Sequence, residues 1–263
     1  MEAFFSIALF FFAGLVSGAF GGLLGLGGST ILVPILVLAM GLPMHLVIAI
    51  GLMNNVVVSS SAVLRYHSMG LIHKKTVLIM NLGSIPGIVA GTLIASSSTE
   101  STIKVIFGIF LIIAIVQAFI KKGASEKEPI GEPDKVNVKG LSLLGMVMGT
   151  LGALLGIGGG VIAVPAQTSL FGIPLKNAIA NSLGTIIAAS TLGAIVYFYV
   201  NAGSLFRVDE ALLIIAAVAP GSVIGSWIGA WSSEKIPTKT IKYLFYITMI
   251  YISFNMLKSG LGF

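Results

Sequence analysis

The chain has 263 residues, of which 56% are hydrophobic and only 9% are charged. Soluble domains carry about 25% charged residues, so this chain cannot cover a water-exposed surface, and its mean hydropathy of +1.06 agrees. A soluble enzyme, a disordered chain and a coiled coil are therefore excluded. The composition predicts an all-α polytopic membrane protein whose partner is the lipid bilayer.

The net charge of +6 arises in short breaks between apolar runs, so we expect no nucleic-acid partner. With no cysteine and three scattered histidines, we expect no metal site and no cofactor. The start of the chain lacks a basic region and a cleavage site, and we interpret it as a retained transmembrane segment.

Ten apolar runs, separated by Gly, Pro or charged residues, follow one another along the chain. They cover residues 3–23, 29–42, 44–64, 76–95, 103–120, 140–155, 160–172, 175–200, 211–231 and 240–258. A membrane crossing needs about 20 residues, and the second run of each half has only about 14. These two short runs are predicted to be broken or re-entrant helices, which leaves 8–10 crossings.

One polar stretch, at residues 121–139, separates the two sets of five runs. It holds nine of the 24 charged residues and two prolines. The predicted organisation is an N-terminal membrane repeat (1–121), a charged cytoplasmic linker (122–139) and a C-terminal membrane repeat (140–263).

The two halves repeat each other, including the Gly, Pro and charged residues that separate the apolar runs. Residues 18–34 align without a gap with residues 149–165, at an offset of 131. The same offset aligns the Gly-Leu-Pro at 41–43 with the Gly-Ile-Pro at 172–174. Further along, after small insertions in the second half, Pro86 aligns with Pro220 and Glu100 aligns with Glu234. The pattern indicates two homologous halves.

The positions of Lys and Arg distinguish parallel from inverted repeats. If the loop with Arg65, Lys74 and Lys75 is cytoplasmic, ten crossings place 12 of the 15 basic residues inside and three outside. Eight crossings, with the short runs re-entrant, place ten inside and five outside. The first count favours inverted repeats with both termini outside.

The two glycine clusters, at 25–28 and 156–160, are the most informative motifs. One interpretation is close helix packing through small residues. The other is a break within the membrane, where the backbone N–H groups of the next helix face an anion. On this second interpretation Ser29 is an N-cap, and the candidate substrate-binding residues are Gly27, Gly28, Ser29, Gly159 and Gly160.

Two further runs, at 83–91 and 221–229, place a small residue at every fourth position. This spacing predicts a helix face for close packing rather than a binding site. Pro86 and Pro220 are predicted to kink these helices.

Polar side chains inside the apolar runs are the remaining candidates, because they are costly in a membrane. Ser and Thr can bond to their own helix, whereas Asn and Gln need other partners. The candidate substrate-binding residues from this class are Asn54, Asn55, Gln167, Thr168, Asn181 and Ser182. The offset of 131 predicts that Asn181 and Ser182 lie close to the glycine break if the repeats pack together.

No Asp or Glu lies in the middle of an apolar run, so neither a carboxylate proton relay nor an acidic sodium cage is visible. Arg65 and Arg207 lie near the predicted interfaces, where topological anchoring is the simpler interpretation. Alternatively, Arg65 and His67 form a vestibule that concentrates anions.

Four features of the sequence together indicate a known family. These are the duplicated Gly-rich element with its Val-Pro ending, the two Gly-Leu/Ile-Pro turns, the basic loop and the charged linker. In these features the sequence resembles the TauE/SafE family of sulfite and organosulfonate exporters. The resemblance spans roughly residues 5–257. It implies about eight crossings and export of small anions such as sulfite or sulfoacetate. Where the family commonly has a Thr-Ser-Leu-like triplet, the first repeat has Ile50-Gly51-Leu52, while the second keeps Asn181-Ser182-Leu183. A site built on this triplet would be asymmetric.

The resulting hypothesis is an exporter of a small sulfur oxyanion in the cell inner membrane, with a midplane site at the repeat interface. Two alternatives are a membrane-embedded enzyme acting on a lipid-linked phosphate and a metal-ion permease. Both would need carboxylate, His or Cys clusters that the sequence lacks. A homodimer is compatible with the sequence.

Overall fold

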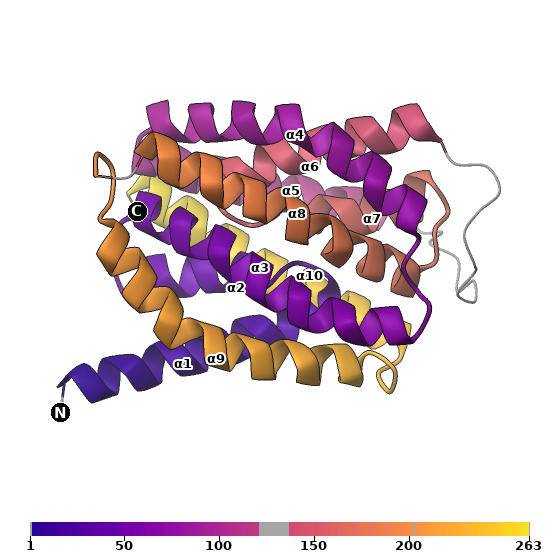
Figure 1. The fold of residues 1–263 in the computed structure, drawn as a ribbon, viewed down its shortest axis with the longest axis horizontal. Coiled ribbons are helices and arrows are strands. Elements are labelled where there is room, and N and C mark those ends of the chain that lie inside the picture. Colours follow the sequence, from indigo (N-terminus) through magenta and orange to yellow (C-terminus); the bar gives the residue numbers. More distant parts are fainter. Residues whose placement is uncertain (1, 121–136, 202, 263) are drawn as a thin grey trace.

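The computed structural model describes residues 2–120, 137–201 and 203–262, and the regular elements of this part of the chain are helices joined by short loops (Figure 1). The predicted linker lies mostly outside the described residues. The elements are α1 (Glu2–Leu24), α2 (Ser29–Pro34), the π-helix η1 (Ile35–Ala39), α3 (Met44–Ser68), α4 (Lys74–Ser97), α5 (Glu100–Ile120), α6 (Val138–Leu155), α7 (Gly160–Leu170), α8 (Leu175–Asn201), α9 (Val208–Ser232) and α10 (Thr238–Leu261).

The ten predicted runs match these helices, with α2 and η1 forming one run. Among the described residues, six helices are long and apolar enough to cross a membrane, namely α1, α3, α4, α6, α8 and α9. The Ser29–Ala39 and Gly160–Leu170 segments are shorter apolar helices. The prediction that the second run of each half is short is therefore confirmed, and the protein is a polytopic helical membrane protein.

Two helix pairs pack backbone to backbone through glycine. On α1, Gly14 and Gly18 face the carbonyl groups of Val218 and Ser222 on α9, and Gly225 of α9 faces Leu15 in return. A Cβ at any of these glycines would overlap the facing carbonyl oxygen, so only glycine permits this approach. The packing role predicted for the 221–229 stripe is confirmed.

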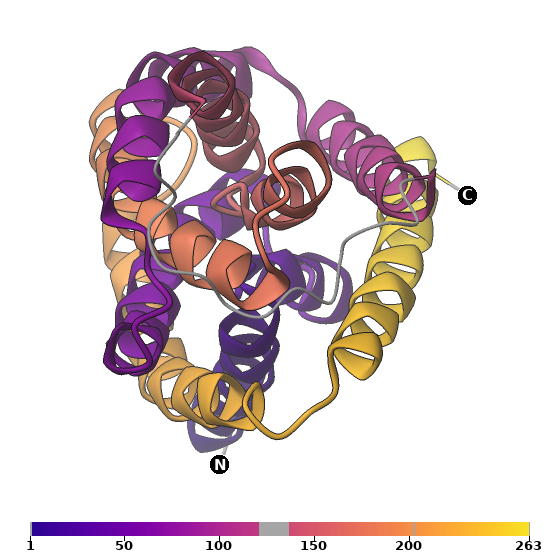
Figure 2. The ribbon, with the colours of Figure 1, turned by 90° about the vertical axis from the view of Figure 1, so that its right-hand side faces the viewer.

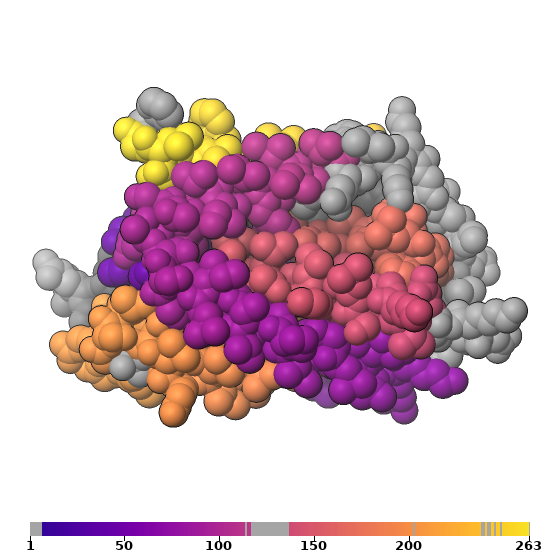
Figure 3. All heavy atoms as spheres, turned by 90° about the horizontal axis from the view of Figure 1, so that it is seen from above, coloured from indigo at the N-terminus to yellow at the C-terminus, as the bar shows by residue number. Residues whose placement is uncertain are grey.

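The pair formed by α4 and α6 is built in the same way and lies across the middle of one face of the molecule (Figure 3). Gly83, Gly87 and Gly91 of α4 follow the carbonyls of Ser142, Met146 and Thr150 on α6. In both pairs the residue numbers rise together, so the two helices run in the same direction. The first helix of each half thus packs on the fourth helix of the other half. Pro86 and Pro220 lie inside α4 and α9, and α9 bends part-way along its length (Figure 1).

The third helix of one half packs against the third helix of the other half (α3 with α8), and the fifth packs against the fifth (α5 with α10). Both pairs are antiparallel. His45, at the start of α3, contacts Tyr197 near the end of α8, and the loop after α3 contacts Asn177 at the start of α8. On α5 and α10, Gly108 faces Leu257 while Gly260 faces Val105. Seen along the helices, the long elements surround the short ones (Figure 2).

The outer surface of the bundle is apolar. Along α4, the exposed side chains include Leu78, Leu82, Ile85, Val89 and Leu93. Such a surface would be unfavourable in water and suits hydrocarbon. The bundle therefore presents apolar side chains outward and buries its polar ones.

Candidate functional site

Both glycine clusters are backbone breaks. Gly25, Gly27 and Gly28 have φ values of 74°, 82° and 89°, and in the second cluster Gly156, Gly158 and Gly159 have values of 71°, 70° and 76°. Only glycine adopts this left-handed region readily, so each cluster ends one helix and starts the next within four or five residues. Each glycine cluster is therefore a break between two helices.

The two breaks contact each other in the interior. A Cβ on Gly160 would overlap the carbonyl oxygen of Gly25 and lie 2.8 Å from the Cα of Leu26. Both breaks are buried throughout. The short helices of the two halves therefore begin at one shared place.

Asn55 of α3 and Ile186 of α8 occupy the centre of this contact. A Cβ on Gly27 would lie 2.7 Å from the Oδ1 of Asn55 and 3.2 Å from Ile186. A Cβ on Gly158 would lie 2.9 Å from the Nδ2 of Asn55 and 3.0 Å from Ile186. Asn55 and Ile186 are equivalent by the offset of 131, so one central position is polar and its counterpart is aliphatic.

The Asn55 carboxamide joins the two halves. The backbone N–H of Ser29 donates to its Oδ1 (3.2 Å), and its Nδ2 donates to the carbonyl of Gly156 (3.2 Å). Ser29 itself is not an N-cap, so that prediction is wrong. Gly28 takes the capping position, and the Ser29 hydroxyl, already inside the helix, donates to the carbonyl of Gly51 (2.5 Å).

The hydroxyl of Ser182 satisfies the corresponding carbonyl in the other break. It donates to Gly25 at 2.9 Å, which confirms that Ser182 lies at the break. The equivalent residue in the first half is Gly51, where a Cβ would lie 2.6 Å from the carbonyl oxygen of Gly156. Asn55 therefore supplies to Gly156 the hydrogen bond that a serine at position 51 would have supplied.

Asn54, the neighbour of Asn55, carries a buried donor beside the first break. Its Oδ1 accepts from the hydroxyl of Ser222 on α9 (2.6 Å), and a Cβ on Gly28 would lie 3.3 Å from its Nδ2. Among the described residues this Nδ2 finds no partner, although Asn54 is fully buried. An unpaired buried donor costs about 1–3 kcal/mol, which favours a position that an acceptor occupies at some stage.

Other buried hydroxyl groups near the breaks also lack partners within the described part of the chain. They belong to Thr30 of α2, Ser59 of α3 and Ser190 of α8. Ser59 and Ser190 are equivalent in the two repeats, one helical turn beyond Asn55 and Ile186. A cavity of about 10 Å³ beside Gly158 is lined in part by Ser190. It has room for about one water molecule, so a larger anion could enter only if the helices separated.

Gln167 and Asn181 bind each other and neighbouring backbone. The Nδ2 of Asn181 donates to the Oε1 of Gln167 (3.1 Å), and the backbone N–H of His73 donates to the Oδ1 of Asn181 (2.7 Å). The Nε2 of Gln167 donates to the carbonyl of Ala178 (3.3 Å). The hydroxyl of Thr168 donates within its own helix to Pro165 (2.9 Å). In this conformation the two amides hold the loop after α3 against α8.

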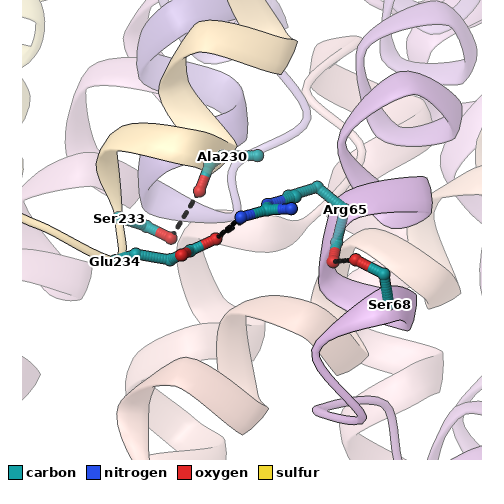
Figure 4. Close-up of polar contacts among 5 residues, drawn as sticks. All are labelled: Arg65, Ser68, Ala230, Ser233 and Glu234. Atoms are coloured by element: carbon teal, nitrogen blue, oxygen red, sulfur yellow. Dashed lines mark hydrogen bonds and ion pairs between the residues drawn. The ribbon is translucent and has the colours of Figure 1, made fainter.

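The two predicted vestibule residues differ in their surroundings. The guanidinium of Arg65, at the end of α3, forms an ion pair with Glu234 just after α9, with its Nε donating to Oε1 at 2.7 Å (Figure 4). Both side chains are about one-third exposed. His67 is exposed. Arg65 thus joins two helix ends here, and an arriving anion would compete with Glu234 for it.

The described residues contain no group of three or more His, Asp and Glu side chains that could hold a metal ion. The donors at the breaks are uncharged amides, hydroxyls and backbone N–H groups. Such a set can hydrogen-bond an oxyanion without adding a permanent charge.

Comparison with known proteins identifies the family. The sequence model described as "Sulfite exporter TauE/SafE" matches residues 10–256. The chain belongs to the TauE/SafE family. No solved structure matches it.

Proteins similar to this chain carry transporter names. The "Probable membrane transporter protein YunE" of Bacillus subtilis is 29% identical over 273 residues, which cover 94% of this chain and 96% of YunE. A probable membrane transporter protein of Methanocaldococcus jannaschii is 27% identical, with 90% of both chains covered. The "Probable membrane transporter protein MamO" of Paramagnetospirillum magneticum is 28% identical over 93% of this chain, which spans only 43% of MamO's length. These relatives are thus named as probable membrane transporters, and the chain spans less than half the length of MamO.

Sequence reasoning missed two residues at the breaks. Ile186 is an ordinary aliphatic residue, and only applying the offset of 131 to Asn55 would have singled it out. Ser222 lies in a small-residue stripe, where its packing role hides its hydrogen bond to Asn54.

Proposed function

We propose that this protein exports small sulfur-containing oxyanions, most suitably sulfite or an organosulfonate, across the cell inner membrane. The substrate would bind at the repeat interface, where the two glycine breaks meet. The observation that carries this proposal is the buried Nδ2 of Asn54 beside Gly28, which finds no partner among the residues that the structure describes. The family description supports the substrate class.

The donor chemistry is suited to release as well as binding. Neutral donors hold an oxyanion through several moderate hydrogen bonds, whereas a buried arginine would form a much stronger charge-assisted pair. The proposed substrate-binding residues at the breaks are Gly27, Gly28, Ser29, Asn54, Asn55, Gly159, Gly160 and Ser182. Gln167, Thr168 and Asn181 would contribute if their present hydrogen bonds open. Arg65 and His67 would form the vestibule at the entrance.

The proposed architecture is two inverted repeats. The antiparallel pairing of α3 with α8, and of α5 with α10, supports it, because these helices are equivalent in the internal alignment. Equivalent helices that run in opposite directions are typical of inverted-repeat transporters, whose substrate sites lie between the repeats at half depth.

The membrane potential is a sufficient driving force. Moving one negative charge out of a cell that is negative inside releases about 2.3 kcal/mol per 100 mV. Export therefore requires no second energy source.

Anion flux in proteoliposomes tests the proposal. Sulfite, sulfoacetate, taurine, sulfate and chloride would be compared under an imposed potassium/valinomycin potential. We expect flux of a sulfur oxyanion that follows the potential and falls strongly in Asn54→Ala. Asn255→Ala is the matched control, because that amide bonds to Tyr251 of its own helix (2.8 Å). Flux of divalent metal ions in place of anions, or a wild-type rate in Asn54→Ala, would contradict the proposal.

A further inference from the structure

A buried histidine lies at the end of α3 away from Arg65. His45 is 7% exposed, and its Nδ1 lies 3.0 Å from the hydroxyl of the fully buried Tyr197. The carboxylate of Glu100, at the start of α5, acts electrostatically on both residues. None of these three residues belongs to the proposed anion site.

The internal repeat places an equivalent group at the opposite end of the bundle. Tyr66 is the counterpart of Tyr197 by the offset of 131, and Glu234 is the counterpart of Glu100. Tyr66 is likewise fully buried, and Glu234 acts on it as Glu100 acts on Tyr197. Each end of the bundle therefore has a buried tyrosine on which a glutamate acts electrostatically.

The two ends differ in their basic residues. At one end Glu234 pairs with Arg65, which stays charged at every physiological pH. At the other end, the position equivalent to Arg65 is Val196, and the basic side chain on which the glutamate acts electrostatically is His45. A histidine carries charge only after it binds a proton, and its ordinary titration range includes physiological pH.

We propose that His45, with Tyr197 and Glu100, is a proton-binding site that makes anion transport depend on the pH at this end of the protein. This inference rests on the proposed function. His45 takes one proton from the adjoining compartment and returns it there or to the opposite side. No other covalent bond is made or broken.

Protonation would change the hydrogen bond between α3 and α8. In a neutral imidazole, Nδ1 can accept the hydrogen of the Tyr197 hydroxyl, whereas in the imidazolium both ring nitrogens donate. The bond to Tyr197 then reverses, and the ring gains attraction to Glu100. Since α3 also carries Asn54 and Asn55, a shift of its first turn is transmitted along one continuous helix to the breaks.

Other charged groups at this end lie on α9, α5 and α10. On α9, Glu210 follows Asp209 in the first turn. On α10, Lys258 lies in the last turn, two residues before Gly260, which faces Lys104. Phe206 stacks on Tyr197 with a centroid distance of 5.9 Å, and the adjacent Arg207 is bonded to Asp209. On α5, Lys104 lies one turn beyond Glu100. The segment before α3, residues 39–43, carries no titratable side chain.

The test measures sulfoacetate flux in proteoliposomes between about pH 5.5 and about pH 8, the range in which a histidine titrates. Sulfoacetate stays doubly ionised there, so its own charge does not change. We expect the wild-type rate to change by about fivefold or more across the range and His45→Gln to be flat. Tyr197→Phe, which removes the bonded hydroxyl, should shift the midpoint. Tyr199→Phe, at a 91% exposed position, is the matched control and should keep the wild-type profile.

Each result has a definite meaning. A flat wild-type profile, or an unchanged profile in His45→Gln, overturns the inference. If His45→Gln does not assemble, as judged by size exclusion, the Tyr197→Phe midpoint decides, and an unshifted midpoint also overturns it. If the wild type transports neither sulfoacetate nor sulfite at any pH, the proposed function has failed, which is a different outcome from a pH-independent flux.

Discussion

Replacing Asn55 by alanine should separate the two halves at their central contact. The change removes the acceptor for the Ser29 N–H and the donor to the Gly156 carbonyl, both buried. Each backbone group left unsatisfied costs about 1–3 kcal/mol, so the variant should lose about 2–6 kcal/mol. For a chain of this size, 1 kcal/mol corresponds to about 2–4 °C in the unfolding midpoint.

The assay is thermal unfolding of the purified protein in detergent, with anion flux measured on the same preparation. Asn55→Ala should melt at least about 4 °C below wild type, given the smallest expected loss of stability. Asn255→Ala, which loses a bond within its own helix, should change stability by less than about 0.5 kcal/mol. Equal melting temperatures for wild type and Asn55→Ala would refute the reasoning that this carboxamide joins the breaks.

Asn55→Asp would separate the structural role from the transport role. The carboxylate can still accept from Ser29 but cannot donate to Gly156, so about half of the stability loss of Asn55→Ala is expected, together with the cost of burying a charge. At a pH at which the introduced carboxyl is ionised, its negative charge should abolish anion flux by repulsion. Retained flux in this variant would place the anion path elsewhere.

Three further predictions concern packing and charge. In thermal unfolding, Gly225→Ala should destabilise the α1–α9 pair by about 1–3 kcal/mol, because its Cβ would overlap the facing carbonyl of α1. Gly193→Ala is the control. Its Cβ would lie 3.4 Å from the nearest neighbouring atom, so this variant should be neutral or more stable. Gly51→Ser, which restores the residue type of the second repeat, should lower rather than raise the unfolding temperature, because its Cβ would approach the carbonyl of the second break to 2.6 Å. A double-mutant cycle of Arg65→Gln and Glu234→Gln should give a coupling of only about 0.2–1 kcal/mol in thermal unfolding, since the pair is partly exposed, and the coupling should fall as salt is added.

The helices and their order were predictable because their determinants are local. Each helix corresponds to an apolar run bounded by Gly, Pro or charged residues. The Gly and Pro residues repeated in both halves indicated the two short helices. The close packing of the small-residue stripe in α9 was also predictable, because spacing by four residues places Gly221, Gly225 and Gly229 on one face.

The partners of the polar residues were not predictable in the same way. Asn181 and Ser182 are adjacent in the chain but point to different places, one to the loop after α3 and the other to the first break. Ser29 was expected to cap α2, but the left-handed backbone of Gly28 moves the cap one residue earlier. Such assignments depend on which face of a helix meets which neighbour, and a single sequence does not give that information.

The pairing of α1 with α9 has a consequence for biosynthesis. Gly14 and its neighbour Ser222 are separated by 208 residues, and translation proceeds at about 5–20 residues per second, so α1 must wait about 10–40 s for its partner. During that interval its glycine face is exposed to lipid or to the insertion machinery. Completion of the fold therefore depends on the last third of the chain, and a ribosome that stalls before α9 leaves α1 without its main packing surface.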